Sequence, residues 1–279
     1  MIETGKMNTL AVMKETDSGF FLADKERNEV LLPISHSKPS VKPGDQLEVF
    51  IYTDSEGRLM ASLKEPYVKV GEFGYLRVAS VSDMGAFMDW GLEKDLFVPF
   101  GEQREKMEAD AFHVVYVYID KISGRIAGSA KPEKFLETEE IGLTPGQEVE
   151  LLLYDESPLG FSCIINNKYK GLIYHSDIYT DVYVGDEMKG YVKNIREDKL
   201  VDISFQKSGF KNVLDSTEVV MEYLNKHGGF IPLHDKSSPE EISIQLSMSK
   251  ATFKKAIGIL YRHRKVLIKP DGVYLVRDN

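Results

Sequence analysis

The stretch SVSDMGAFMDWG, residues 80–91, places a glycine and an alanine between a polar turn and a run that ends in the only tryptophan of the chain. Its side chains alternate in character, as they do in a β-strand with one buried face. A glycine within a strand permits a sharp bend because it has no Cβ to clash. The stretch therefore predicts a strand of a small, strongly curved sheet.

The same pattern occurs three times when the chain is aligned on Gly19, Gly85 and Gly160. An apolar residue lies seven positions before each glycine, and an apolar pair lies twelve and thirteen positions after it. A turn and two further strand-like segments complete each copy. Five short strands within about 60–65 residues predict a five-stranded Greek-key barrel, the OB-fold.

From about residue 211 the pattern changes from strands to helices. Ser238-Pro239-Glu240-Glu241 forms a capping box that predicts the start of a helix, and Ser249 caps the basic segment that follows. Pro270-Asp271-Gly272 separates two short apolar segments and predicts a hairpin. Three helices and a β-hairpin within about 65 residues predict a winged helix.

We therefore expect a mainly β protein with a C-terminal α+β module, made of three tandem OB-fold barrels followed by a winged-helix domain. The expected barrels span residues 1–65, 66–132 and 145–210, a helical linker spans 133–144, and the winged helix spans 211–279.

Charge is distributed unevenly along the chain. Residues 1–210 carry 24 basic and 36 acidic side chains, a net of −12, whereas residues 211–279 carry 11 basic and 8 acidic ones, a net of +3. The acidic part argues against a protein that coats nucleic acid indiscriminately, and the basic module favours an anionic partner. The single cysteine, Cys163, permits no internal disulfide and is expected to be buried. No apolar run could span a bilayer or act as a signal peptide, so we expect a cytoplasmic protein without membrane contact.

The repeats carry the motifs of a known domain. The second copy reads Val78-x-x-Val81-x-x-x-Gly85-Ala86-Phe87-Met88, then Leu96-Phe97-Val98-Pro99, then Asp120 and Arg125-Ile126-x-x-Ser129. This copy resembles the ribosomal S1-type RNA-binding domain. The first copy matches nearly as well, and the third is degenerate.

The resemblance implies that a phenylalanine two residues after the glycine stacks on a base. It further implies RNA contacts from an aromatic residue fourteen positions after the glycine and from an acid and an arginine on the last strands. The matching positions are Phe21, Asp54, Arg58, Phe87, Asp120, Arg125 and Tyr174. The third copy has Ser162 and Leu200 where the others have phenylalanine and arginine, so we expect it mainly to position the winged helix.

The residues alone leave the role of these rings open, because aromatic side chains in a small barrel can also belong to its core. For Trp90 we expect packing in the core or at a domain interface.

The last predicted helix has one basic side. A helical wheel places Phe253, Ala256, Ile257 and Leu260 toward the core. Residues 249–265 contain six basic residues and no acidic one. We expect Lys250, Lys254, Lys255 and Arg262 to contact nucleic acid; a solvated face or a protein-binding face are the alternatives.

Tandem S1-type barrels followed by a winged helix resemble the bacterial conserved virulence factor B family, which implies an RNA-binding regulator of gene expression. The sequence contains no HExxH motif, P-loop or nucleophile elbow, so we expect no enzyme, no metal and no cofactor. We expect a monomer that binds single-stranded RNA and acts after transcription. Two alternatives stay open, namely a DNA-binding transcription regulator that uses the winged helix, and a translation or ribosome-associated factor.

Overall fold

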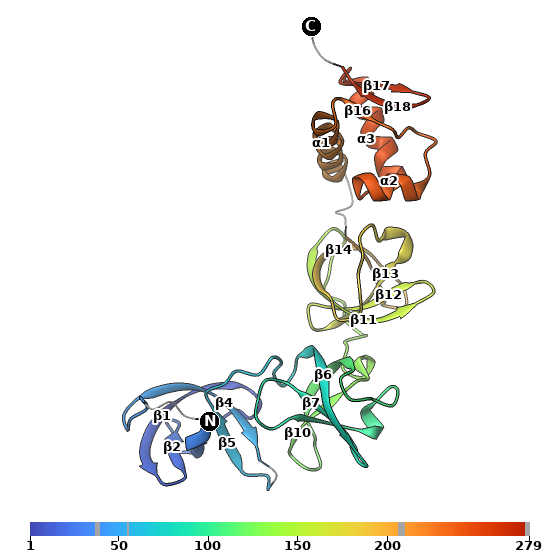
Figure 1. Cartoon of the computed structure of the whole chain (residues 1–279). Coiled ribbons are helices and arrows are strands. Elements are labelled where there is room, and N and C mark those ends of the chain that lie inside the picture. The colour runs from blue at the N-terminus through green and yellow to red at the C-terminus, as the bar shows by residue number, and fades with distance from the viewer. Residues whose placement is uncertain (37–39, 55, 206–209, 277–279) are drawn as a thin grey trace. The chain divides into compact units, whose positions relative to one another are not determined.

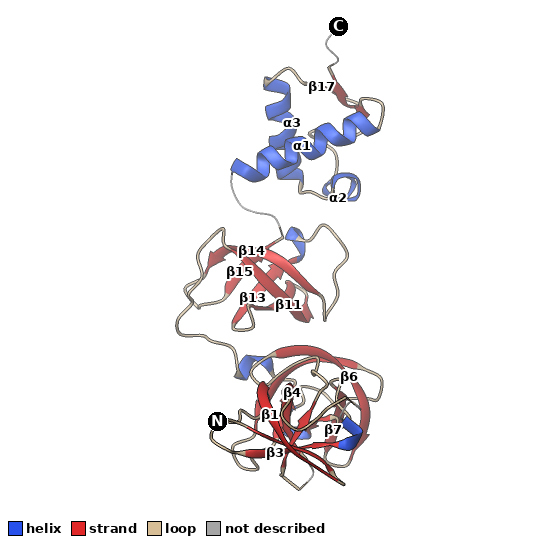
Figure 2. Cartoon of the chain, turned by 90° about the vertical axis from the view of Figure 1, so that its left-hand side faces the viewer, coloured by secondary structure: helices blue, strands red, loops and turns tan. Residues whose placement is uncertain are grey.

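The computed structural model describes residues 1–36, 40–54, 56–205 and 210–276. The chain forms two compact units, Met1–Leu136 and Glu137–Asn279. The first unit contains two five-stranded β units, blue to green in Figure 1. The second contains a further barrel and a C-terminal module in which the long helices gather (Figure 2). The expected fold class is confirmed.

The three β units share one strand order. The first strand pairs with the second and the fourth, and the fifth lies between the third and the fourth in barrels 1 and 3. Barrel 1 consists of β1 (Met7–Thr16), β2 (Gly19–Ala23), β3 (Glu29–Pro33), η1 (Ile34–His36), β4 (Gln46–Thr53) and β5 (Leu59–Ser62). Barrel 2 consists of β6 (Phe73–Ser82), β7 (Gly85–Asp89), β8 (Leu96–Pro99), η2 (Phe100–Glu102), β9 (Phe112–Ile119) and β10 (Ile126–Ser129). Barrel 3 consists of β11 (Glu148–Ser157), β12 (Gly160–Ile165), β13 (Tyr169–Tyr174), η4 (His175–Asp177), β14 (Glu187–Ile195) and β15 (Val201–Ser204).

Barrels 1 and 3 are closed, whereas the sheet of barrel 2 is open between β8 and β10. The two edges still pack together, because Gly128 of β10 lies against Val98 and Leu96 of β8. The missing side chain at Gly128 lets the two strands approach, and a Cβ there would lie 2.9 Å from Val98.

The glycine that defines each repeat does not mainly provide the bend that the sequence suggested. A β-bulge interrupts the pairing of the first strand instead, between Val78 and Ser80 in barrel 2 and at the matching place in the other barrels. Gly85 instead begins the second strand at φ 157°, and a Cβ there would lie 2.3 Å from the carbonyl oxygen of Val98. Glycine is needed because the backbones of the second and third strands approach too closely for any side chain.

The C-terminal module is a winged helix whose sheet has one strand more than expected. It consists of α1 (Phe210–Lys226), β16 (Phe230–Ile231), α2 (Pro239–Leu246), α3 (Lys250–Arg262), β17 (Val266–Lys269) and β18 (Gly272–Leu275). The capping box at Ser238 and Glu241 is present, and Ser249 caps α3 through the N–H of Thr252. The short strand β16 pairs with β18 and extends the predicted hairpin to three strands.

The segment between barrels 2 and 3 is not the helix that its composition suggested. Only Pro132–Lys134 forms a single 3-10 turn, η3. Phe135 then stacks on Tyr116 of β9 with ring centroids 4.2 Å apart, and Glu137 forms an isolated bridge with Tyr169. These contacts to the flanking sheets replace the hydrogen bonds that would continue a helix.

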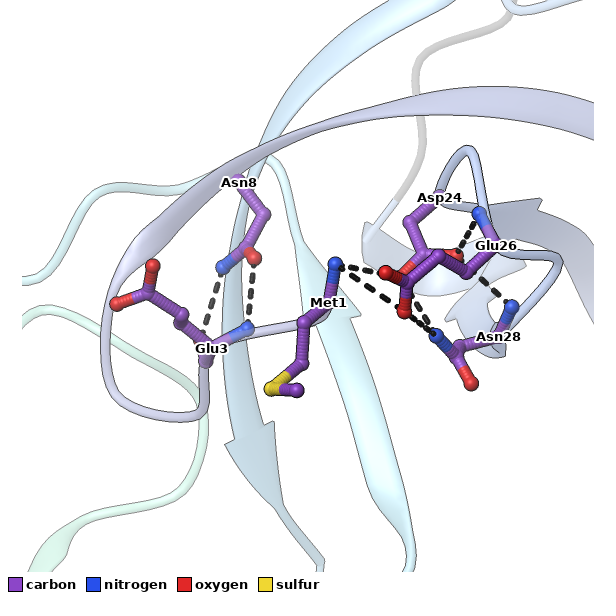
Figure 3. Close-up of polar contacts among 6 residues, drawn as sticks. All are labelled: Met1, Glu3, Asn8, Asp24, Glu26 and Asn28. Atoms are coloured by element: carbon purple, nitrogen blue, oxygen red, sulfur yellow. Dashed lines mark hydrogen bonds and ion pairs between the residues drawn. The ribbon is translucent and has the colours of Figure 1, made fainter.

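The turn between β2 and β3 is organised by one carboxylate, shown in Figure 3. Asp24 accepts hydrogen bonds from the backbone N–H groups of Glu26 and Asn28 at 2.9 Å and from the Asn28 side chain at 2.7 Å. Its oxygen also lies 3.1 Å from the amino group of Met1. These contacts, the Asn28 side chain foremost, lower the pKa of Asp24 to about 2.

Candidate nucleic-acid interface

Phe21 and Phe87 lie on the outer faces of barrels 1 and 2, at equivalent positions on the second strand. Both rings are half-buried, whereas their neighbours Phe20 and Met88 point inward and are buried. This alternation follows from the pleat of the strand, which sends successive side chains to opposite faces. Neither phenylalanine therefore belongs to the apolar core of its barrel.

The two rings have different neighbours. The ammonium of Lys14 lies 4.5 Å from the centroid of the Phe21 ring, a cation–π arrangement on the same face. Phe87 instead faces Phe97 across β7 and β8, with centroids 5.2 Å apart and a tilt of 41°. Barrel 1 thus combines a ring with a cation, and barrel 2 presents a pair of rings.

The predicted acid and arginine of barrel 1 form an ion pair at the turn between β4 and β5. Arg58 donates from Nε and Nη2 to Oδ2 of Asp54 at 2.7 Å, and its backbone N–H donates to Oδ1 at 2.9 Å. Desolvation raises the pKa of Asp54, but the bonds from Arg58 outweigh it and hold that pKa below its usual value. The Arg58 side chain remains 67% exposed, so its guanidinium faces solvent while it is held in place.

Barrel 2 arranges the equivalent residues differently. Asp120 accepts hydrogen bonds from the backbone N–H and the hydroxyl of Ser123, both at 2.7 Å, and these lower the pKa of its carboxyl group. Arg125 is exposed at the end of the same turn, where its carbonyl accepts from the N–H of Asp120 at 2.8 Å. The acid therefore shapes the turn that presents the arginine.

Barrel 3 has a guanidinium near its remaining aromatic ring, contrary to what its sequence suggested. Arg196, which follows β14, lies over the ring of Tyr174 at 5.8 Å and donates a hydrogen bond to the phenolic oxygen. Its Nε also donates to Asp202 of β15 at 2.9 Å. The resemblance places the arginine at the position of Leu200. It does not predict Arg196, because this side chain reaches the Tyr174 ring from the opposite side of the β14–β15 hairpin.

The basic face of α3 lies where the helical wheel placed it. Phe253, Ala256, Ile257 and Leu260 are buried, and Lys254, Lys255 and Arg262 are exposed on the other side. Within the described ranges, no carboxylate forms an ion pair with these three side chains. Lys250 is half-buried at the first turn and lies 3.5 Å from the carbonyl oxygen of Lys236. The face can therefore offer its charges to an anionic ligand.

Two of the remaining expectations can be compared directly with the structure. Trp90 is 3% exposed and packs against Phe50 of barrel 1, as expected for core or interface packing. Cys163 is buried, also as expected, and burial raises the pKa of its thiol. No group of three or more metal-ligating side chains occurs among the residues that the structure describes. Helices in the described part of the chain are all too short or too polar to cross a membrane.

Two family models agree with the domain types at the two ends of the chain. Residues 218–275 match the model of the CvfB-like winged helix domain, and residues 4–64 match that of the S1 domain. A conserved virulence factor B of Staphylococcus aureus strain MRSA252 is 24% identical over 98% of this chain and 94% of its own. A crystal structure of a multidomain protein with nucleic acid binding domains from Streptococcus pneumoniae is 24% identical, covers 98% of both chains and has a TM-score of 0.42.

A relative from Bacillus subtilis strain 168, the uncharacterized protein YitL, is 30% identical over 97% of this chain and 93% of its own length. The S1 and winged-helix domains together support nucleic-acid binding. With this match along nearly its whole length and the family's own winged-helix domain at its C-terminal end, the chain belongs to the conserved virulence factor B family.

Proposed function

We propose that the protein binds single-stranded RNA through barrels 1 and 2 and the basic face of α3, and regulates gene expression after transcription. The observation that carries this proposal is the position of Phe21 and Phe87, two half-buried rings at equivalent outward sites. A base stacked on such a ring contributes about 1–3 kcal/mol, whatever its identity. The exposed Arg58 and Arg125 near the ends of these barrels suit phosphate or base contacts.

The basic helix supports the same ligand class in a different way. Lys254, Lys255 and Arg262 are long cations beside Gly258, a residue with no side chain to hold a ligand away. Such a face suits the phosphate backbone, which carries no sequence information of its own. We therefore assign affinity to α3 and base contacts to the barrels. We further propose that the protein acts as a cytoplasmic monomer without a cofactor.

A titration followed by fluorescence anisotropy tests the proposal. A single-stranded RNA, the single-stranded DNA of the same sequence and the matching duplex DNA are titrated at several salt concentrations. We expect the RNA to bind most tightly, with an affinity that falls steeply with salt because each neutralised phosphate releases counterions. Equal or tighter binding of the duplex DNA in the same salt would refute the proposal.

The exposed cations of α3 also favour a second candidate, a DNA-binding regulator that uses the winged helix. In that case the RNA would gain nothing from the rings, and Phe21→Ala and Phe87→Ala would leave duplex binding unchanged while a triple substitution of Lys254, Lys255 and Arg262 abolished it.

A further inference from the structure

Barrels 1 and 2 share an apolar interface that is continuous with the core of barrel 2. Phe50 and Tyr52 of β4 point away from the core of barrel 1, yet they are only 0% and 7% exposed. Both belong to the apolar cluster of barrel 2, where Phe50 meets the edge of Trp90 with ring centroids 5.6 Å apart. The outer side of β4 is therefore covered by the neighbouring barrel.

Polar contacts fix the same interface at its rim. The ammonium of Lys94, in the turn between β7 and β8, donates to the carbonyl oxygen of Thr53 at 2.7 Å. The backbone of Lys94 is itself held by the indole N–H of Trp90, which donates to its carbonyl oxygen at 2.6 Å. The N–H of Val70 also donates to the carbonyl oxygen of Gly5 at 3.1 Å. A side chain of barrel 2 is thus pinned to the last residue of β4 in barrel 1.

Lys94 joins the two segments that carry the proposed RNA contacts. Thr53 directly precedes Asp54, whose carboxylate holds Arg58. On the other side, the hairpin of Lys94 is formed by β7 and β8, the strands of Phe87 and Phe97. Desolvation, and after it the positive charge of Arg125, lower the pKa of Lys94.

A continuous row of paired residues leads from this junction to the ring of barrel 1. Met60 of β5 packs against the shared apolar cluster and pairs with Leu31 of β3. Leu31 in turn pairs with Phe21 across β2 and β3. The strand of Phe21 is therefore linked through paired strands to the apolar cluster that the two barrels share, and not by the connecting chain alone.

We infer that Lys94 is a positioning residue that locks barrels 1 and 2 into one rigid RNA-binding unit, so that a single strand long enough to reach both barrels binds more tightly than either barrel alone allows. The inference rests on the proposed function. Its physical basis is effective concentration: once one ring has engaged the strand, the second ring is already held at a fixed distance. Loosening the junction spreads the second ring over many positions and weakens only the binding of long strands.

The test compares two oligouridylates on the full chain. One of about 5 nucleotides suits a single OB-fold, and one of about 20 nucleotides exceeds the site of a single fold. Lys94→Met removes the ammonium but keeps the aliphatic stem. Lys106→Met removes the same charge from an exposed position in the loop before β9 and serves as the matched control. We expect Lys94→Met to weaken the long oligonucleotide about tenfold while the short one changes less than about twofold.

A distance measurement on the free protein separates rigidity from RNA contact. Spin labels at Lys25→Cys in barrel 1 and Lys121→Cys in barrel 2 report the spread of distances between the barrels. The native Cys163 is fully buried and does not compete for the label. We expect a narrow distribution for the otherwise unaltered chain and a broader one when Lys94→Met is added.

Each other outcome overturns the inference. A long-strand affinity that falls no further than in the control, with an unchanged distance distribution, would mean that the lysine does not hold the barrels. An equal loss for both lengths would mean that Lys94 contacts RNA itself. If neither oligonucleotide bound the unaltered chain, the proposed function would fail together with the inference, and this result is distinct from both others.

Discussion

Replacing Phe87 with alanine tests whether the outward rings bind RNA. The ring is half-buried, and its main neighbour is Phe97 at 5.2 Å. An aromatic pair of this geometry contributes about 0.5–1.5 kcal/mol beyond the area it buries. We therefore expect the free energy of unfolding to fall by about 1–2 kcal/mol, less than the roughly 3–5 kcal/mol that a fully buried phenylalanine would cost.

The same substitution should also weaken RNA binding. Loss of one stacked base costs about 1–3 kcal/mol of binding free energy, which corresponds to a rise in the dissociation constant of about 5- to 150-fold. The chain offers a closely matched control. Tyr75 and Phe112 form a similar ring pair on β6 and β9, with centroids 5.3 Å apart and a tilt of 34°. Tyr75→Ala should reduce stability comparably and leave RNA affinity within about twofold of the original, because its ring lies outside β7 and β8.

Both quantities are measured on the same samples, by urea denaturation followed by tryptophan fluorescence and by anisotropy titration with a labelled single-stranded RNA. If Phe87→Ala left the RNA affinity unchanged, or if Tyr75→Ala weakened it equally, the assignment of the outward ring as a stacking platform would be wrong. A loss of stability beyond about 3 kcal/mol would show instead that the ring serves mainly as core.

Three further predictions follow from the same structure. Replacing Lys254, Lys255 and Arg262 together with alanine should weaken binding similarly for unrelated RNA sequences, because phosphate contacts carry no sequence preference. The slope of log affinity against log salt should also fall by about 2, because fewer phosphates are neutralised and fewer counterions are released. Titrations at three salt concentrations measure both effects, and an effect on one sequence alone would contradict the prediction. Tyr174→Ala should change RNA affinity less than about threefold in the same assay, because the Arg196 guanidinium already lies over the Tyr174 ring and donates to its hydroxyl. A tenfold loss would instead show that barrel 3 is a binding surface. Asp24→Asn should reduce stability at neutral pH, because the pKa of Asp24 is lowered in the folded state. The difference in stability from the original chain should disappear as the pH falls from about 4 to about 2. Denaturation curves across that range check the sign, and a difference that stays constant would contradict the prediction.

The sequence predicted the repeated fold because one steric constraint recurs. Gly19, Gly85 and Gly160 each begin a second strand where a Cβ would lie within 2.3 Å of a carbonyl oxygen of the third strand. That contact tolerates no other residue, so the glycine marks the register in every copy, even where the surface residues have changed. The side-chain alternation beside each glycine then determines which face of the strand is core.

The sequence predicted core or interface packing for Trp90 but did not identify β4 of barrel 1 as its partner, although a signal for this was present. Residues 49–52, VFIY, form an unbroken apolar run rather than an alternating one. Such a run is typical of a strand that is buried on both faces. Val49 and Ile51 fill barrel 1, and Phe50 and Tyr52 fill the space against barrel 2. Only the second barrel, far along the chain, explains why the outward pair is apolar.

The outward positions also differ in a way that matches the roles we propose for the three barrels, which share one core plan. Opposite residues on the first three strands share one face, and in barrels 1, 2 and 3 these sets are Lys14, Phe21 and Leu31; Ser80, Phe87 and Phe97; and Asp155, Ser162 and Leu172. The first set combines a cation with a ring, and the second presents two rings, so both suit a stacked base near a phosphate. The third set has no ring and begins with an acid, and Asp202 lies beside its leucine on β15. Acidic side chains on this face repel a phosphate backbone, and the guanidinium of Arg196 is already paired with Asp202. The same core is thus compatible with an outer face that suits a nucleic acid or with one that does not, and we propose that the residue two positions after the glycine, phenylalanine or serine, separates the two cases.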